Sequence, residues 1–209
     1  MDPLPLLTGF FLGIRHCLEA DHLAAIAQLA SAAKGPRQGL RSGLLWGAGH
    51  GVAVLALVGL FSGVQERLAP YESAAERAVG ITLIVLAAWR LRAFFHKPHA
   101  HLHRHANGVV HVHTHAHDLD HAHLHAPTLV GLVHGTAGSF GVLALLSFGE
   151  SPLALAAAFC LGTLLAMGTA GWVVARFYGG AGLLGLERAA LGATGLGGLV
   201  LGAIWLVKF

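Results

Sequence analysis

Charged residues are scarce in this chain of 209 residues. They make up 11% of it, whereas soluble globular domains carry about 25%. Hydrophobic residues make up 55%, and they form long runs, each able to supply the roughly 20 apolar residues that a membrane-spanning helix needs. The runs are continuous and do not alternate with polar residues, which argues against a barrel of strands. Composition therefore predicts a helical membrane protein and excludes a soluble domain.

Cysteines and clustered basic residues are also few. Cys17 and Cys160 both lie inside apolar runs, where a thiol is usually a small packing residue, so a disulfide framework is not expected. Lysines and arginines are scattered and form no basic face of the kind that binds nucleic acid. The first residues, "MDPLPLL", lack the basic region and cleavage site of a signal peptide, so the first apolar run is expected to be retained as a helix.

The fold class expected from these runs is all-α, a polytopic membrane protein with six transmembrane helices. Turn-forming stretches such as "KGPRQG", "GESP" and "YGGAG" separate the runs. The expected helices are Leu4–Ala33, Leu40–Val64, Ala74–Phe95, Thr128–Phe148, Pro152–Tyr178 and Leu183–Val207. This divides the chain into a first three-helix half (1–95), a histidine-rich loop (96–127) and a second three-helix half (128–209).

The distribution of lysine and arginine predicts the orientation in the membrane. The basic residues of the first, third and fifth connections are Lys34, Arg37, Arg41, Arg90, Arg92, Lys97, Arg104, Arg176 and Arg188, and those of the opposite side are Arg67, Arg77 and Lys208. Because basic residues favour the cytoplasmic side, both termini are expected outside and the histidine-rich loop in the cytoplasm.

The two halves resemble each other weakly. "GIRHCLEADHLAAI" and "GLVHGTAGSFGVLA" share glycine, an aliphatic residue and histidine at matching offsets. Because each half contains an odd number of helices, the second copy must enter the membrane from the other side. The expected architecture is a 3+3 inverted repeat, and such repeats usually meet at a substrate site near the bilayer midplane.

The first expected helix contains five ionisable side chains. Each costs at least ~2.5 kcal/mol at the bilayer centre, so such groups tend to face a cavity or one another. Arg15 and Glu19 are neighbours at i,i+4 on a regular helix and are expected to form an internal ion pair. They are also candidates for supporting residues beside a metal site or along the path of the metal.

His16, Asp21 and His22 supply two imidazoles and one carboxylate, a ligand set suited to Ni(II), Co(II), Zn(II) or Fe(II). On a regular helix, however, Asp21 and His22 would point about 140° and 240° away from His16. One ion cannot be chelated in that arrangement. Either the helix is distorted here, which we favour, or some of the three orient their neighbours.

Ligands from other helices are expected from His50 in "WGAGHGVAV" and His134 in "VGLVHGTAGS". A lone histidine in a span is often only a hydrogen-bonded packing residue, but together with the first helix these make four intramembrane histidines, which favours metal. Both lie among glycines, which permit close helix approach and leave room for carbonyls and water. Thr136 and Ser139 are candidates to line the path, although small polar residues more often bond across a helix interface.

These residues resemble a known family. "HCLEADH" matches the His-x4-Asp-His signature of the nickel/cobalt transporter family, "GAGHGVAV" resembles its second-helix segment, and "GLVHGTAGS" and "LGTLLAMG" resemble segments of the urease-accessory-type nickel permeases of that superfamily. The resemblance implies transport of Ni(II) or Co(II), with His16, Asp21, His22 and His50 as functional positions. The chain is shorter than the eight-helix members and lacks their later acidic motifs. A related exporting branch generally lacks the aspartate, so Asp21 favours uptake.

The loop between the halves alternates histidine with other residues. Besides His96, its histidines are His99, His101, His103, His105, His111, His113, His115, His117, His121, His123 and His125. Alternation is typical of a strand, but Gly108 and the low complexity of the loop favour disorder. Because histidine tracts bind divalent metals through many exchangeable ligands, an accessory metal reservoir or sensor is expected here, with a passive spacer as the alternative.

Together these observations predict a secondary transporter and not an enzyme. The cargo is Ni(II) or Co(II), no cofactor is permanently bound, and the expected location is the cell inner membrane. The expected partners are the lipid bilayer, the metal ion and a cytoplasmic metallochaperone, without nucleic acid. The alternatives are an efflux permease, a membrane di-iron oxygenase, which would need several histidine boxes on ordered helices, and haem ligation by His50 and His134.

Overall fold

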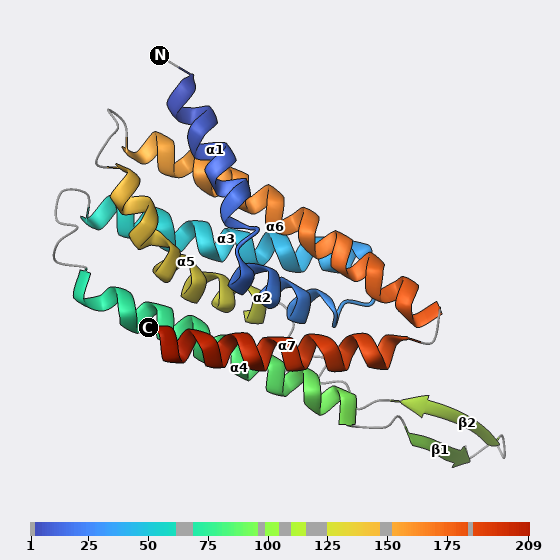
Figure 1. Ribbon diagram of the computed structural model, residues 1–209. Coiled ribbons are helices and arrows are strands. Elements are labelled where there is room, and N and C mark those ends of the chain that lie inside the picture. Colours follow the sequence, from blue (N-terminus) through green and yellow to red (C-terminus); the bar gives the residue numbers. More distant parts are fainter. Residues whose placement is uncertain are drawn as a thin grey trace.

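A computed structural model describes residues 3–61, 69–95, 99–104, 110–115, 125–146, 152–183 and 186–209. Helices dominate the described part of the chain (Figure 1). The elements are α1 (Leu4–His16), α2 (Ala20–Ala30), α3 (Pro36–Phe61), α4 (Ala69–Phe95), β1 (His99–Arg104), β2 (Val110–His115), α5 (His125–Leu146), α6 (Pro152–Leu183) and α7 (Glu187–Lys208).

The first expected helix is broken, and the distortion predicted near His16 is confirmed. The break lies between α1 and α2, toward the middle of the bundle (Figure 1). Leu18 N donates to Arg15 O at 2.9 Å and Glu19 N to His16 O at 3.1 Å, so the last turn of α1 tightens. Glu19 is then extended, with φ −68° and ψ 148°, and α2 starts after it. No glycine or proline lies at the break.

The other five expected helices are all present, with starts and ends that differ from the expected ones by a few residues. α3 and α6 begin with Pro36 and Pro152, which suit a first helical position because proline lacks the N–H that would have no partner there. The expected ends at Val64 and Phe148 lie outside the described residues. Among the described residues, three helices are long and apolar enough to cross a membrane, namely Pro36–Leu60, Pro152–Ala181 and Arg188–Lys208. The membrane class is thus supported.

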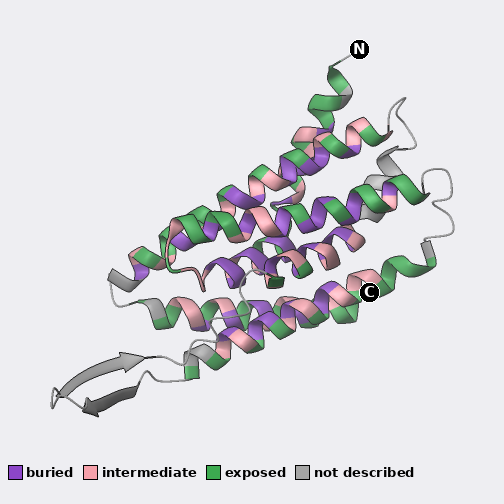
Figure 2. Ribbon diagram, turned by 180° about the vertical axis from the view of Figure 1, so that it is seen from behind, coloured by how far each residue is buried: buried purple, intermediate pink, exposed green. Residues whose placement is uncertain are grey.

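The helices pack across the two halves of the chain. α3 lies against α5 and α6, α1 lies against α6, α4 lies against α7, and the short α2 contacts α3, α4, α6 and α7. Both termini lie toward one end of the bundle and β1 and β2 toward the other (Figures 1 and 2). Figure 2 shows buried residues concentrated where the helices face one another.

Glycines allow two of these crossings to be close, and the two crossings are alike. A side-chain carbon added at Gly13 would lie 2.9 Å from Thr163 N on α6, and one added at Gly131 would lie 2.9 Å from His50 N on α3. The first helix of each half therefore rests on the second helix of the other half through an equivalent glycine. His16 follows Gly13 by the same number of residues as His134 follows Gly131.

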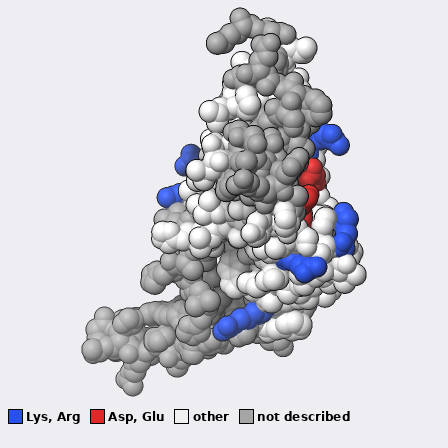
Figure 3. All heavy atoms as spheres, turned by 90° about the vertical axis from the view of Figure 1, so that its left-hand side faces the viewer, with Lys and Arg blue, Asp and Glu red and all other residues white. Residues whose placement is uncertain are grey.

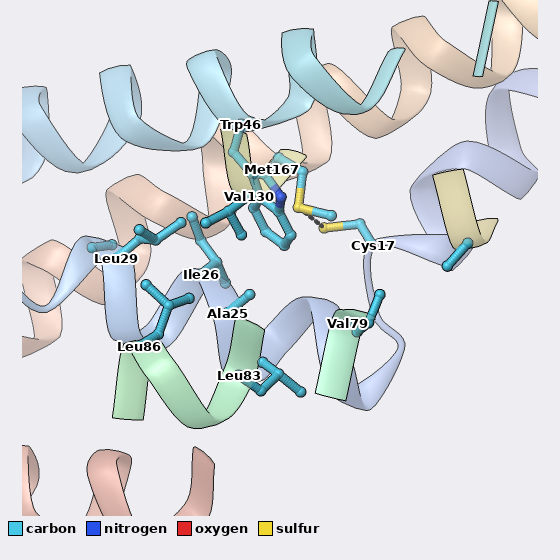
Figure 4. Packing of buried hydrophobic residues seen from close by; sticks show 12 residues of the cluster. Cys17, Ala25, Ile26, Leu29, Trp46, Val79, Leu83, Leu86, Val130 and Met167 are labelled. Carbon is cyan, nitrogen blue, oxygen red and sulfur yellow. Dashed lines mark hydrogen bonds between the residues drawn. The ribbon is translucent and has the colours of Figure 1, made fainter. Parts of the chain in front are cut away.

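The core beside the break is apolar and tightly packed. Trp46, Ile26, Leu83 and Met167 are fully buried, and they gather around α2 (Figure 4). The Cys17 thiol donates to the Met167 sulfur at 3.4 Å, which agrees with the expectation that this cysteine is a packing residue. The two described cysteines are both free.

The described part of the histidine-rich loop forms a two-stranded antiparallel sheet, a pairing that the sequence did not predict. β1 pairs with β2 in a register that sets His99 opposite His115, His101 opposite His113 and His103 opposite His111. Each alternating stretch of the loop forms a strand, and the two strands pair with each other. Composition alone does not reveal this pairing. Apart from β1 and β2, the elements of the described chain are helices, as the predicted all-α class requires.

Candidate metal centre

The break between α1 and α2 brings His16 to the interior of the bundle. Its Nδ1 lies 3.0 Å from Glu19 Oε2, and its Nε2 lies 3.2 Å from Nε2 of His50 on α3. A metal bound at about 2.1 Å by two nitrogens at right angles would separate them by about 3 Å. The observed separation therefore matches two ligands on one ion.

Asp21 and His22 lie at the start of α2, buried against the same cluster. Asp21 is 6% exposed and His22 is 1% exposed, and His22 Nδ1 lies 2.9 Å from Asp21 Oδ2. A carboxylate in contact with the Nδ1 of an imidazole orients the ring and leaves Nε2 for a metal. Asp21 also supplies a negative charge beside the imidazoles, which compensates the charge of a divalent ion.

His50 and His134 are fully buried, with 0% of their surface exposed. His134 Nδ1 donates to Val130 O at 3.0 Å within α5, so its Nε2 carries the lone pair. The His22 ring lies 5.4 Å from the ring of His50 and 5.4 Å from that of His134, measured between centroids. Imidazoles from α1, α2, α3 and α5 thus gather in one part of the bundle, and the His22 ring lies beside the other three.

Two overlapping groups of donor atoms could hold a metal among the residues that the structure describes. His16, His22 and His50 offer nitrogens that all lie within 4.8 Å of one another, and Glu19, Asp21 and His22 offer a second such group. His22 belongs to both groups. His134 belongs to neither, although its ring lies beside His22, so it stands at the edge of the cluster.

Several buried polar atoms of the cluster have no hydrogen-bond partner within the described part of the chain. They are Asp21 Oδ1, His22 Nε2, His50 Nδ1 and His134 Nε2. Buried polar atoms are almost always satisfied in folded proteins, because an unpaired one costs free energy. The arrangement is the one expected of a site that binds a cation.

Aromatic side chains enclose the cluster. The Trp46 ring lies 5.5 Å from that of His22 and 5.4 Å from that of His134, and the Phe159 ring lies 5.3 Å from that of His16. Sequence reasoning missed both residues. Trp46 precedes His50 by one helical turn, so helical spacing from a predicted ligand could have found it, whereas Phe159 lies on α6 and carries no such signal.

The predicted ion pair between Arg15 and Glu19 is wrong. Glu19 contacts His16 instead, and Arg15 is exposed on α1. The prediction assumed a continuous helix, in which residues at i,i+4 are neighbours, but the extended backbone of Glu19 turns its side chain away from that row. The Glu19 side chain is 56% exposed, so it links the buried cluster to the surface.

The remaining predicted residues lie outside the cluster or outside the described residues. The Thr136 hydroxyl donates to Val133 O within its own helix, at 2.6 Å. The side chain of Ser139 is not described, and neither are His105, His117, His121 and His123. His125 is the exposed first residue of α5. Figure 3 shows the described basic side chains of one face in separate places, some of them beside acidic side chains.

Comparisons with known proteins give one informative similarity. The urease accessory protein UreH of Bacillus sp. (strain TB-90) is 30% identical over 151 residues, which covers 69% of this chain. The chain is similar to UreH. It spans 63% of the length of that protein. No protein-family model matches the chain, and no solved structure matches it.

Proposed function

We propose that this protein is a secondary transporter that takes up Ni(II), with Co(II) as a second cargo, across the cell inner membrane. The observation that carries the proposal is the buried group of His16, His22 and His50 with Asp21 beside it, on helices of a chain whose composition is that of a membrane protein. Imidazole and carboxylate ligands suit borderline divalent metals. A buried site between helices suits cargo that must be stripped of water and then released.

The similarity to UreH supports the same function. It agrees with the resemblance of "HCLEADH", "GAGHGVAV" and "GLVHGTAGS" to the nickel/cobalt transporter family and its urease-accessory-type branch. The carboxylate of Asp21 favours uptake over the exporting branch. Because the chain spans only part of UreH, nickel as the cargo rests mainly on the ligand chemistry and the motifs.

An inverted repeat of two three-helix halves is the architecture that we propose for transport. In its support, α1 packs on α6 as α5 packs on α3, each through an equivalent glycine. His16 and His134 then occupy equivalent positions in the two halves, each at the same spacing after its glycine. In such repeats the two halves exchange conformations, which opens the site alternately to each side of the membrane.

The orientation that we propose has both termini outside and β1 and β2 in the cytoplasm. The paired strands support an accessory metal-binding role, because three pairs of opposed histidine positions follow one another along the register. Directly opposed residues on neighbouring strands are close enough to bind the same metal ion. A reservoir there would receive the ion after release, and a cytoplasmic metallochaperone would take it from the same side.

Metal flux in proteoliposomes tests the proposed function. Purified protein is reconstituted, and entry of Ni(II), Co(II), Zn(II), Mn(II) and Fe(II) is measured with protein in each orientation. We expect flux of Ni(II) and Co(II) that His16→Ala abolishes and that Phe11→Ala, a substitution of an exposed residue on the same helix, leaves intact. Flux only in the opposite direction would identify an exporter, and no flux of any metal would overturn the proposal.

A further inference from the structure

Three glycines of α5 face the cluster or the helix beside it, but they do so differently. A side-chain carbon at Gly135 would lie 2.5 Å from the His50 carbonyl oxygen, and one at Gly131 would meet the backbone of Trp46 and His50. These two glycines permit close packing of α5 on α3. Gly138 has another environment.

A side-chain carbon added at Gly138 would lie among the imidazole tips of the metal cluster. It would be 2.8 Å from His16 Nε2, 3.2 Å from His16 Cε1 and 3.2 Å from His50 Nε2. Among the glycines whose surroundings the structure describes, Gly138 is the one whose missing side chain would meet ring nitrogens. The space that glycine leaves there borders the two nitrogens that lie 3.2 Å apart.

An ion held by His16, His22 and His50 has three imidazole ligands and needs further ones. Tetrahedral Zn(II) is satisfied by one more ligand, whereas Ni(II) and Co(II) favour larger coordination numbers in sites of nitrogen and oxygen. The space beside Gly138 adjoins two of the three nitrogens, so water or a carbonyl there can reach the same ion.

We propose that Gly138 is a specificity-determining residue that keeps a ligand position open for water on the transported ion. This inference rests on the proposed function, because it needs a metal at the histidine cluster. It goes further because it states that Gly138, which has no side chain, allows the bound ion to have more than four ligands. Filling the position with a methyl group would penalise Ni(II) and Co(II) more than Zn(II).

Gly138→Ala tests the inference without removing any ligand. The atoms that the new methyl would meet are the ends of side chains, which can move, so the variant is expected to fold. Gly51→Ala is the matched control, because its added carbon would lie 3.4 Å from Cys160 Cβ, an ordinary contact. Both substitutions are made in the full chain with its loop histidines replaced by serine, so that binding reports on the cluster.

Binding of Ni(II), Co(II) and Zn(II) is then measured by calorimetry in detergent, together with the visible spectrum of bound Co(II). We expect Gly138→Ala to weaken Ni(II) and Co(II) binding by about 10- to 100-fold, as changes around metal ligands do, and Zn(II) binding by less. The Co(II) spectrum should change from weak absorption, typical of five or six ligands, toward the intense absorption of a tetrahedral site. Gly51→Ala should match the parent chain.

Equal losses for Ni(II) and Zn(II), or unchanged Ni(II) affinity, would overturn the role of Gly138 and leave the proposed function standing. The parent chain supplies a second reading that needs no variant, since an intense tetrahedral Co(II) spectrum there would also overturn the inference. Failure of the parent chain to bind any of the three metals would instead overturn the proposed function.

Discussion

Nε2 of His16 lies 3.2 Å from Nε2 of His50, although 34 residues separate them in the sequence and they belong to α1 and α3. Two imidazole lone pairs cannot face each other at this distance unless a proton or a cation lies between them. A proton or a cation between the two nitrogens therefore links α1 to α3.

Removal of either ring should abolish tight metal binding. For His16→Ala and His50→Ala we expect affinity for Ni(II) to fall by more than the roughly 10- to 100-fold that changes to supporting residues cause. Calorimetry in detergent measures this on chains whose loop histidines are replaced by serine, with Phe11→Ala, a substitution of an exposed residue of α1, as the control. Affinity within a few-fold of the parent chain for either variant would place the metal elsewhere.

Asp21→Asn should separate the charge of Asp21 from its shape. We expect Ni(II) affinity to fall by about 10- to 100-fold, because the amide orients His22 poorly and offsets no charge. Without metal, the loss of thermal stability should be small, because the amide oxygen can still accept a hydrogen bond from His22 Nδ1. Thermal unfolding with and without Ni(II) measures both effects. A large loss of stability in the metal-free state would indicate a structural role instead.

Addition of Ni(II) should stabilise the folded protein. A ligand present at 100 times its dissociation constant adds about 2.7 kcal/mol if it binds only the folded state. We therefore expect a concentration-dependent rise in the unfolding temperature that His22→Ala removes. The parent and variant are compared with loop histidines replaced by serine. An equal rise in both would show that the stabilising metal binds outside the cluster.

The close helix crossings should be sensitive to any side chain. Gly13→Ala and Gly131→Ala would place a carbon against backbone atoms of α6 and α3, and overpacking of this kind costs about 1–3 kcal/mol. Gly59→Ala is the control, because nothing lies within 4 Å of its added carbon. Thermal unfolding measures the difference. Similar unfolding temperatures for all three variants would contradict the packing described here.

The histidine pairs of β1 and β2 should tune transport without being essential to it. Replacing the six histidines of the register with serine keeps the loop length, and we expect lower apparent Ni(II) affinity with a preserved maximal rate. Concentration-dependent flux in proteoliposomes distinguishes the two parameters. A complete loss of flux would assign these histidines to the transport path itself.

Much of this arrangement could be predicted from the sequence, for reasons that differ between residues. Apolar runs and turn residues located the helices because membrane burial acts along each segment. The break after His16 was predictable because a regular helix would point His16, Asp21 and His22 in separate directions. The contact between Glu19 and His16 was not predictable, since it depends on the backbone of Glu19 after the break. The space beside Gly138 depends on how α1, α3 and α5 pack together. A local sequence pattern does not predict that packing.

X-ray absorption by Ni(II), bound to the chain with its loop histidines replaced by serine, reports the ligands of the ion itself and so decides whether the histidine cluster binds it. We expect about three imidazole nitrogens at roughly 2.1 Å, with oxygen completing the shell, and fewer imidazoles in His16→Ala. A shell of oxygen or sulfur ligands without imidazole would contradict this expectation.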